Sequence, residues 1–491
     1  MSTTVPTLTT PSLFREQAYL NGAWASASNG ATIPVENPAT REVIGHVPNL
    51  DDATVQSAIT AAHAAFPAWS KTLPRERSNL MRKWHSLMLK HAEDLATLLT
   101  LEQGKPLSES RTEIAYAASF IEWFAEEGPR IAGEIPTSTK PGQRMLVLRQ
   151  SVGVAAAITP WNFPSAMVTR KIAPAIAAGC PVLLKPAELT PFSALALAAL
   201  AEEAGIPKGV FSVLTGDSAR IGPAFTGDAR IRKLSFTGST RVGKLLASAS
   251  ADNLKRLSLE LGGNAPFIVF NDANLEDAAN ALMACKFRNA GQTCVCANRV
   301  LVEDGVYDKF LSVFAPKVAA LKLGSGLEAG VTIGPLITKL AQEKVNRLTS
   351  DAEKKGAKRE TSASPSAPDL PGYFCAPAIY TDADAKMDMF HEEIFGPIAP
   401  LTRFKGEEEA VKLANATPYG LASYVFTNDH KRIWRVAEGL EYGMVGVNEG
   451  YVSNPVAPFG GVKESGYGRE GSIHGIDEYL EYKYVCLGGI A

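Results

Sequence analysis

The chain has 491 residues, and at ~150 residues per domain this length predicts about three domains. Its 49 basic and 51 acidic side chains leave a formal charge of −2, so composition gives no sign of a nucleic-acid or membrane partner. Hydrophobic residues make up 46% and charged residues 20%, as in globular enzymes, which excludes extensive disorder.

Cysteine and histidine usage argues against a disulfide framework and against a metal site. Six scattered cysteines form no Cys-x-x-Cys pair, and seven histidines show no ligand spacing. The N-terminal stretch MSTTVPTLTTPSLF lacks the basic and apolar regions of a leader. The longest uncharged stretch, residues 150–169, contains Pro160 and Pro164, which disfavours a membrane helix. We therefore expect a cytoplasmic protein without a bound metal.

Helices and then alternating strands are predicted for the first half of the chain. Apolar residues spaced i, i+4, i+7 and i+11 predict a helix at residues 55–66. Longer helical stretches are predicted near 74–102 and 108–127. Short apolar runs then predict strands at 181–184, 211–214 and 233–236, with helices starting near 191 and 240. This alternation predicts a mostly parallel sheet with helices on both faces.

A second α/β series is predicted from about residue 262. Strands are expected at 266–270, 421–427 and 444–447, and Val306, Phe310 and Val313 predict one face of a helix. The tail from Ile473 is rich in tyrosine and apolar residues, which is typical of a strand donated to another subunit or domain. The predicted fold class is therefore α/β throughout.

Two segments contain candidate catalytic side chains. Cys294 follows a Gly-Gln-Thr turn and is a candidate nucleophile, although a lone cysteine is more often a small buried hydrophobic residue. Glu260 ends an apolar strand immediately before a Leu-Gly-Gly turn. Burial there would raise its pKa and suit a general base; the alternative is a solvated residue at a strand end.

Two further segments could bind developing or fixed negative charge. Asn162 lies in a turn between Pro160 and Pro164, where its amide could donate to an oxyanion or simply form the turn. Residues 236–243 (FTGSTRVG) follow a strand and open a helix, where backbone N–H groups can meet a phosphate. A plain helix cap explains that segment equally well.

At two other places in the chain, charged residues could belong either to a binding site or to ordinary surface structure. Lys185 and Glu188, at the end of a predicted strand, could flank a ribose or form a solvated charge pair. The acidic and aromatic residues within 391–397 (HEEIFGP) could belong to a site or to a plain turn.

Taken together, these segments resemble the NAD(P)-dependent aldehyde dehydrogenase superfamily, and they stand along the chain in the family's order. The resemblance covers nearly the whole chain and is carried by LELGG, GQTC, PWNFP, FTGS and EEIFGP. Within the superfamily the chain is most similar to the succinate-semialdehyde dehydrogenases, through residues 120–134, 286–299 and 457–471.

The resemblance implies a role for each matched residue. Cys294 would attack the aldehyde to form a thiohemiacetal, whose oxyanion the Asn162 amide and the Cys294 N–H would hold. Glu260 would activate the water that hydrolyses the resulting thioester. Cofactor contacts are expected from Trp161, Lys185, Glu188, Gly238, Ser239, Gly243, Leu261, Glu393 and Phe395.

The resemblance also implies three structural units. A Rossmann-like cofactor domain would comprise residues 1–129 and 153–261, and an α/β catalytic domain residues 262–462. A bridging β-hairpin and oligomerisation element would comprise residues 130–152 and 463–491. Addition of the tail to a neighbour's sheet implies a homodimer or homotetramer.

The implied reaction is oxidation of succinic semialdehyde to succinate with NAD(P). Glutarate semialdehyde is the alternative substrate, because one methylene is worth only ~1–3 kcal/mol in discrimination. A CoA-acylating enzyme of this family is expected to lack the water-activating glutamate, and Glu260 is present. A catalytically inactive relative would have lost Cys294, Glu260 or Asn162, and all three are present.

Three finer expectations follow from the resemblance. Arg170, Arg288 and Ser453 are expected to hold the substrate carboxylate, unless either arginine forms a structural ion pair. Cys296 is expected to form a reversible disulfide with Cys294, the alternative being an inert packed thiol. Because the carboxylate of Glu188 would repel a 2′-phosphate, we expect NAD to be preferred and NADP also accepted, unless Glu188 points to solvent.

Overall fold

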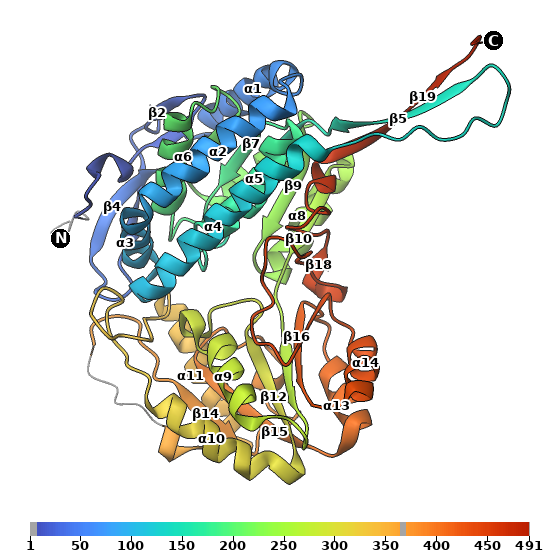
Figure 1. Ribbon diagram of the computed structural model, residues 1–491. Helices are drawn as coiled ribbons and strands as arrows, with labels where there is room; N and C mark the ends of the chain where they lie inside the picture. Colours follow the sequence, from blue (N-terminus) through green and yellow to red (C-terminus); the bar gives the residue numbers. More distant parts are fainter. Residues whose placement is uncertain (1–6, 364–369, 491) are drawn as a thin grey trace.

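The computed structural model describes residues 7–363 and 370–490. The start of the N-terminal stretch analysed above therefore lies outside the described residues. Two helix-covered sheets form the two halves of the molecule, and a long two-stranded arm projects from one of them (Figure 1). In the described ranges, no helix is both long enough and apolar enough to cross a membrane.

The first sheet has the strand order β18-β10-β9-β6-β7-β8-β1-β2, and its five central strands run parallel. The strands predicted near residues 181, 211 and 233 are all present. Its strands are β1 (Ala18–Leu20), β2 (Ala23–Ala25), β6 (Val154–Ile158), β7 (Val182–Lys185), β8 (Phe211–Val213), β9 (Ile231–Thr237), β10 (Arg256–Glu260) and β18 (Gly466–Tyr467).

Helices cover both faces of this sheet, as predicted. They are α1 (Asp52–Trp69), α2 (Pro74–Lys90), α3 (Ala92–Gln103), α4 (Leu107–Glu127), α5 (Ala166–Ala178), α6 (Phe192–Ala204), α7 (Ser218–Gly227) and α8 (Thr240–Ser250). The single helix expected over 74–102 is two helices, because the backbone at His91 ends α2 and starts α3.

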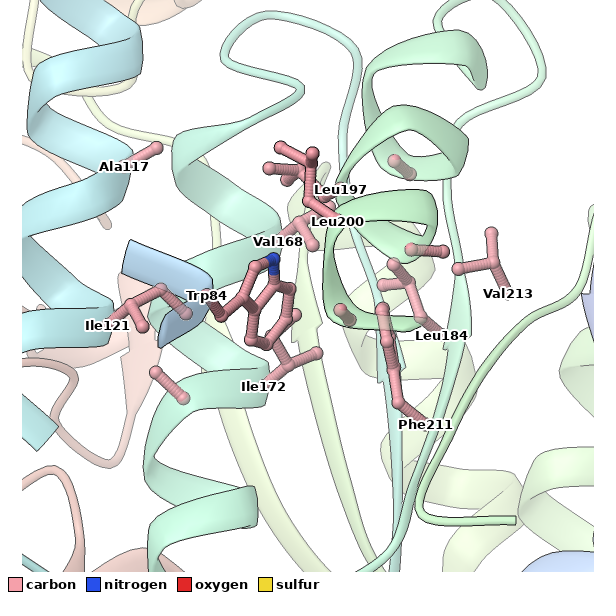
Figure 2. Packing of buried hydrophobic residues seen from close by; sticks show 14 of the residues in the cluster. Trp84, Ala117, Ile121, Val168, Ile172, Leu184, Leu197, Leu200, Phe211 and Val213 are labelled. Carbon is pink, nitrogen blue, oxygen red and sulfur yellow. The ribbon is translucent and has the colours of Figure 1, made fainter. Parts of the chain in front are cut away.

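Alternate residues of the parallel strands face the two helical layers. Ala155 and Ala157 of β6 pack in the core beneath α2, α4, α5 and α6, whereas Val154 and Ala156 pack beneath α1, α7 and α8. In the first layer, the indole of Trp84 lies among side chains from the neighbouring helices and the sheet (Figure 2), with its ring centroid 5.7 Å from that of Phe211. A strand buried on both faces explains the continuous apolar runs in the sequence.

The second sheet has the order β13-β14-β15-β12-β11-β16-β17 and is parallel from β14 to β17. It contains the strands predicted near residues 266, 421 and 444. Its strands are β11 (Ala265–Val269), β12 (Ala297–Glu303), β13 (Lys358–Arg359), β14 (Ala378–Thr381), β15 (Ile398–Phe404), β16 (Ala422–Phe426) and β17 (Met444–Val447). Its helices are α9 (Leu275–Lys286), α10 (Tyr307–Ala319), α11 (Lys339–Lys354), α12 (Asp388–His391), α13 (Gly406–Asn415) and α14 (His430–Gly439).

Two antiparallel pairs complete the fold. Strands β3 (Thr32–Glu36) and β4 (Val43–Pro48) form one, and β5 (Arg144–Ser151) and β19 (Leu480–Leu487) form the projecting arm (Figure 1). Tyr482 and Tyr484 of the arm are exposed. The residues just before β19 belong to the body: β18 pairs with β10, and Tyr479 lies in the core.

The division of the chain into a cofactor domain, a catalytic domain and an oligomerisation element stays a prediction.

Opposite strand ends of the two sheets meet. The carboxyl ends of β6, β9 and β10 and the amino ends of β12 and β15 contribute the residues around one cavity. Only residues 261–264 separate β10 from β11, so the chain passes from one sheet to the other beside this cavity. Loops at the carboxyl ends of parallel strands are where α/β sheets commonly bind ligands.

Candidate active site

The cavity between the sheets has a volume of about 430 Å³. It brings together most of the predicted site residues, from segments more than 200 positions apart: Trp161, Asn162, Arg170, Gly238, Ser239, Leu261, Arg288, Cys294, Glu393, Phe395 and Ser453. The residues Lys185, Glu188, Gly243, Glu260 and Cys296 do not line it.

Cys294 reaches the cavity at the end of an unusual loop. Asn289, Ala290 and Gly291 all have positive φ angles, of 51°, 53° and 76°, which turn the chain sharply after α9. Tyr424 then fixes the next residue, donating from its hydroxyl to the carbonyl of Val295 at 2.7 Å. Burial raises the pKa of the Cys294 thiol to about 12, against a smaller lowering effect of Arg170. The thiol is therefore protonated in this state.

Asn162 is tied to the loop that carries Cys294. Its side-chain nitrogen donates to the carbonyl of Gln292 at 3.0 Å. An amide nitrogen has two hydrogens, so the other remains available at the cavity. A buried amide with one uncommitted N–H is suited to an oxygen on which negative charge develops.

Glu260 lies beside the cavity, at the end of β10. Both carboxylate oxygens are buried and have no hydrogen-bond partner within the described parts of the chain. Burial, with the nearby carboxylate of Glu470, raises the pKa of Glu260 well above its ordinary value. A Cβ at Gly460 would lie 2.7 Å from the backbone oxygen of Gly468 and 2.9 Å from one Glu260 oxygen, so only glycine leaves room there.

The two predicted clamp arginines have different surroundings. The guanidinium of Arg170 lies 2.9 Å from a Glu470 oxygen and 3.9 Å above the Phe459 ring, so it has an ion-pair partner, which it shares with Lys171. This is the structural ion pair that the sequence analysis left open. Arg288 stacks on Phe163 and Tyr451 instead, and no carboxylate in the described ranges forms an ion pair with it. Arg288 is therefore the cation that remains available to an anionic ligand.

Three residues that sequence reasoning missed complete this end of the cavity. Tyr116 lies beside Ser453, and its buried hydroxyl forms no regular hydrogen bond with the described residues. Glu109 lines the same wall and accepts from the backbone N–H of Asn289 at 2.7 Å. Both belong to one face of α4, together with Thr112 and Glu113. Polar residues at i, i+3, i+4 and i+7 are the signal that could have identified this face. The third missed residue is Tyr451.

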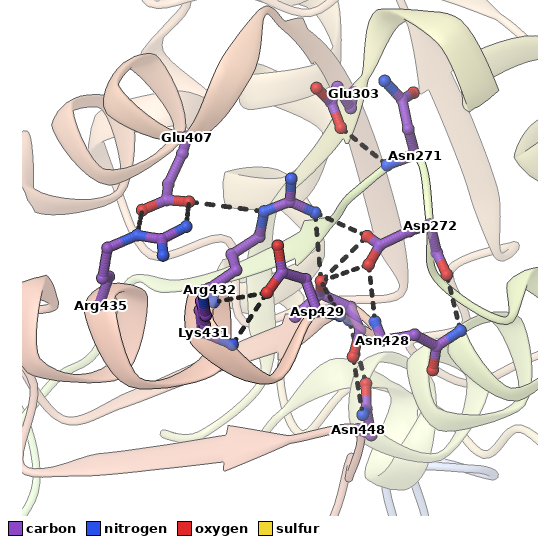
Figure 3. Close-up of polar contacts among 11 residues, drawn as sticks. Asn271, Asp272, Glu303, Glu407, Asn428, Asp429, Lys431, Arg432, Arg435 and Asn448 are labelled. Carbon is purple, nitrogen blue, oxygen red and sulfur yellow. Dashed lines mark hydrogen bonds and ion pairs between the residues drawn. The ribbon is translucent and has the colours of Figure 1, made fainter.

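A surface network anchors the loop that carries Tyr451 and Ser453 (Figure 3). Asn448, with φ of 51°, exchanges hydrogen bonds of 3.0 and 3.1 Å with the backbone of Thr427. The Thr427 hydroxyl donates to Asp272, which also pairs with Arg432 at 2.7 Å. The carboxyl ends of β11, β16 and β17 are thereby joined where this loop begins.

The other side of the cavity has features that fit a dinucleotide. The rings of Trp161 and Phe395 meet edge to face at 5.6 Å. The side chain of Ser239 caps α8 by accepting from the N–H of Val242, which leaves the N–H groups of Thr240 and Arg241 in the first turn without helical partners and suited to a phosphate. The hydroxyl of Thr237 is buried there without a hydrogen-bond partner in the described chain. Glu393 accepts from the N–H of Gly263 at 3.1 Å, and burial raises its pKa to about 7.

Lys185 and Glu188 form a pair at the end of β7. The lysine nitrogen lies 2.6 Å from Glu188 and 2.7 Å from the Ser218 hydroxyl, and the Glu188 side chain is only 33% exposed. Glu188 therefore does not point freely to solvent. Burial opposes ionisation of Glu188, but Lys185 and Ser218 outweigh it and hold the pKa below its ordinary value. Gly243 packs α8 against Leu261, leaving no space for a Cβ.

Cys296 is buried behind the cavity. The side-chain nitrogen of Lys286 lies 3.4 Å from its sulfur. Burial raises the pKa of Cys296, and Lys286 partly opposes this effect.

A doubly wound α/β fold whose cavity combines a cysteine, a free amide N–H and a helix N-terminus defines the class of cysteine-dependent dinucleotide dehydrogenases. The model of the aldehyde dehydrogenase family matches residues 24–485, and the chain belongs to this family.

Relatives of this chain act on different semialdehydes. It is 55% identical over 478 residues to a glutarate-semialdehyde dehydrogenase of Pseudomonas aeruginosa, covering 97% of this chain and 99% of that protein. It is 53% identical over 476 residues to an NADP(+) succinate-semialdehyde dehydrogenase of Escherichia coli, covering 97% and 98%. A crystal structure of succinate-semialdehyde dehydrogenase from Burkholderia pseudomallei has a TM-score of 0.97 at 53% identity, covering 98% of this chain and 100% of that one.

Proposed function

We propose that this aldehyde dehydrogenase oxidises succinic semialdehyde to succinate, with glutarate semialdehyde as the alternative substrate. The observation that carries the proposal is the guanidinium of Arg288 at one end of the cavity, which forms no ion pair with a described carboxylate and whose Nε is buried without a hydrogen-bond partner among the described residues. Ser453 and the Tyr116 hydroxyl lie at the same end and can add hydrogen bonds to a carboxylate. The names of the two semialdehyde dehydrogenases above support an aldehyde with an anionic far end.

The protein's own groups account for the chemistry at the aldehyde end. The Cys294 thiol first loses its proton to water. The thiolate then attacks the carbonyl carbon, and the new oxyanion accepts from the Asn162 amide and the Cys294 N–H. When bound, NAD(P) supplies the hydride acceptor. The acyl group then remains on Cys294 as a thioester. Glu260 takes a proton from a water molecule, whose oxygen attacks the thioester carbon. The C–S bond then breaks, which releases the carboxylic acid and leaves Cys294 as the thiolate and Glu260 protonated.

The dinucleotide would be held at the aromatic and helix-N-terminal side of the cavity. Trp161, Phe395, Gly238, Ser239, Leu261 and Glu393 line that side, and Lys185 and Glu188 lie at the neighbouring strand end. NAD is the preferred cofactor in this proposal and NADP a weaker one. A 2′-phosphate would face the carboxylate of Glu188 and would have to compete with it for Lys185.

A homodimer or homotetramer is proposed as the working form. The β5–β19 arm projects from the body and exposes Tyr482, Tyr484 and Leu487, which association with a second copy would cover.

The test is release of NADH from succinic semialdehyde without CoA. We expect a high kcat/KM for succinic and glutaric semialdehydes and a much lower one for butanal, which has no carboxylate. Release that requires CoA would favour the acylating alternative. An equal preference for butanal would contradict the assignment of an anionic substrate.

A further inference from the structure

A buried polar cluster lies directly behind the turn that carries Asn162, where α3 connects to α4. The Lys105 side chain is fully buried. Its nitrogen donates to Glu113 at 2.6 Å and to the backbone carbonyl of Asn162 at 2.7 Å, and lies 3.8 Å above the ring of Phe163. The lysine thus contacts both the backbone of the Asn162 turn and the aromatic residue next to it.

Glu113 connects the same cluster to the end of that turn. While one of its oxygens binds Lys105, the other accepts from the N–H groups of Ser165 and Ala166 at 3.0 and 3.2 Å. These groups lie at the start of α5, where backbone donors lack helical partners. The Lys105–Glu113 pair therefore holds the turn at both ends.

A second set of contacts fixes the orientation of the Asn162 side chain. The Asn162 carbonyl also accepts from the side-chain nitrogen of Asn289 at 2.9 Å. The Asn289 side-chain oxygen accepts from Gln103, two residues before Lys105, at 2.9 Å. The Asn162 side-chain amide contacts the carbonyl oxygen of Gln292, which can only accept a hydrogen bond. The amide nitrogen, and not the amide oxygen, must therefore face the Cys294 loop. The remaining N–H is thus directed by contacts that begin at the α3–α4 connection.

We propose that Lys105, with Glu113 as its buried counter-ion, is a positioning residue that holds the Asn162 amide in line for the carbonyl oxygen of the aldehyde. This rests on the role proposed above for Asn162. A buried ion pair is costly to desolvate and is weak evidence for a contribution to stability. A rigid support for an oxyanion donor is a function that requires the position, charge and several donors of a lysine.

The test is a double-mutant cycle with Lys105→Met and Asn162→Ala, read by steady-state kinetics on a semialdehyde. A small misplacement of a catalytic group can cost about 100-fold, so Lys105→Met should lower kcat by about 10- to 100-fold and change KM little. In the Asn162→Ala background the same substitution should cost less than about threefold, because the group it positions is gone. Equal losses in both backgrounds would overturn the proposal.

Two further variants separate positioning from misfolding. Lys105→Met combined with Glu113→Gln removes both charges, so no carboxylate is left buried alone, and it should show the same dependence on Asn162. Lys233→Met is the matched control: Lys233 is also fully buried and lies 2.8 Å from Glu478, but its hydrogen bonds go to Ser258 and Glu478 and not to the turn that carries Asn162. Any loss of kcat that Lys233→Met causes should be equal in the wild-type and Asn162→Ala backgrounds. A Lys233→Met effect that also disappears in the Asn162→Ala background would overturn the assignment to Lys105.

The cycle can be repeated with p-nitrophenyl acetate, whose hydrolysis passes an acyl group through Cys294 without a semialdehyde. Suppose that the enzyme does not oxidise semialdehydes, but that the effect of Lys105→Met on ester hydrolysis still disappears in the Asn162→Ala background. Then only the proposed substrate is wrong. If the ester cycle is additive as well, the positioning role is wrong. Alkylation of Cys294 by iodoacetamide does not use the amide, so its rate should be unchanged in Lys105→Met.

Discussion

Burial sets the charge state of the ionisable side chains around the cavity. It raises the pKa of Cys294 to about 12 and of Glu393 to about 7, and it raises that of Glu260 well above its ordinary value. Arg170 forms an ion pair with Glu470, whereas Arg288 stacks on aromatic rings and feels the charge of Glu109 without forming an ion pair with any described carboxylate. An incoming carboxylate would therefore find, in Arg288, a positive charge that has no ion-pair partner among the described residues.

Replacement of Arg288 by alanine should act mainly on substrates that carry an anion. A hydrogen bond to a charged group is worth ~1.5–3 kcal/mol, so Arg288→Ala should lower kcat/KM for succinic semialdehyde by tens-fold or more. The value for butanal should change little. Arg170→Ala is the comparison variant. It removes the ion-pair partner of Glu470, which should lower kcat/KM for both aldehydes alike. Equal losses on both substrates in Arg288→Ala would contradict the clamp.

The raised pKa of Glu260 predicts a pH-dependent second half-reaction. Only the deprotonated carboxylate can accept a proton from water, so thioester hydrolysis should accelerate as the pH rises through this pKa. In stopped-flow experiments, Glu260→Gln should keep the initial burst of NADH but show a slow, nearly pH-independent steady state. Loss of the burst itself would place Glu260 before the thioester.

Cys296 is predicted to make the enzyme sensitive to peroxide. It is two residues from Cys294, and a disulfide between them requires the two Cα atoms to lie within ~7 Å. Wild-type protein should lose activity in peroxide and recover it in dithiothreitol, whereas Cys296→Ala should not recover in this way. The same thiol-reversible loss in Cys296→Ala would exclude the internal switch and leave Cys296 as a packed thiol beside Lys286.

At the scale of elements, the end of β7 is expected to control the choice of cofactor. Strand β7 delivers Lys185, and the turn after it delivers Glu188, whose carboxylate is bound to Lys185 and Ser218. These contacts hold the negative charge in place and occupy the lysine that would otherwise bind a 2′-phosphate.

The expected result is a preference for NAD over NADP of about tenfold or more in kcat/KM. At ~5 Å and an effective dielectric constant of ~20, a pair of like unit charges costs ~3 kcal/mol, and solvent and Lys185 reduce this value. Glu188→Ser should shift the ratio toward NADP, since it frees Lys185. A wild-type preference for NADP would contradict the prediction. An unchanged ratio in the variant would assign the preference to other residues.

At the scale of the whole molecule, the arm is a feature whose aromatic side chains a single chain leaves uncovered. Strands β5 and β19 pair along eight residues each, yet Tyr482 and Tyr484 remain 62% and 58% exposed. Exposed aromatic residues on a projecting ribbon are typical of an association surface.

Charged substitutions on the arm should therefore weaken the assembly. Tyr482→Asp combined with Tyr484→Asp should lower the mass measured by light scattering after gel filtration, because a buried unpaired carboxylate is costly. Trp434→Asp is the control, since Trp434 is 60% exposed on α14, away from the arm. An unchanged mass in the double variant, or a wild-type protein that is monomeric, would contradict the predicted oligomer.

The local pattern of the sequence determined the class of fold and much of the cavity's composition. Apolar runs and turn residues predicted the strands near 181, 211 and 233, because the signal for a strand buried on both faces is local. Short motifs with special turns, such as the one before Cys294, predicted many of the residues that line the cavity. The break at His91 was missed because the helical pattern continues through it.

Only the tertiary structure decided which charges are paired. Arg170 and Glu470 are 300 positions apart in sequence, and nothing local shows that one neutralises the other while Arg288 stays unpaired. The same holds for Lys105, whose partner Asn162 lies 57 positions away. Motifs specify which side chains are present. Which charges form ion pairs, and which way hydrogen bonds point, depends on long-range contacts. These contacts exist only once both sheets and their helices have packed together.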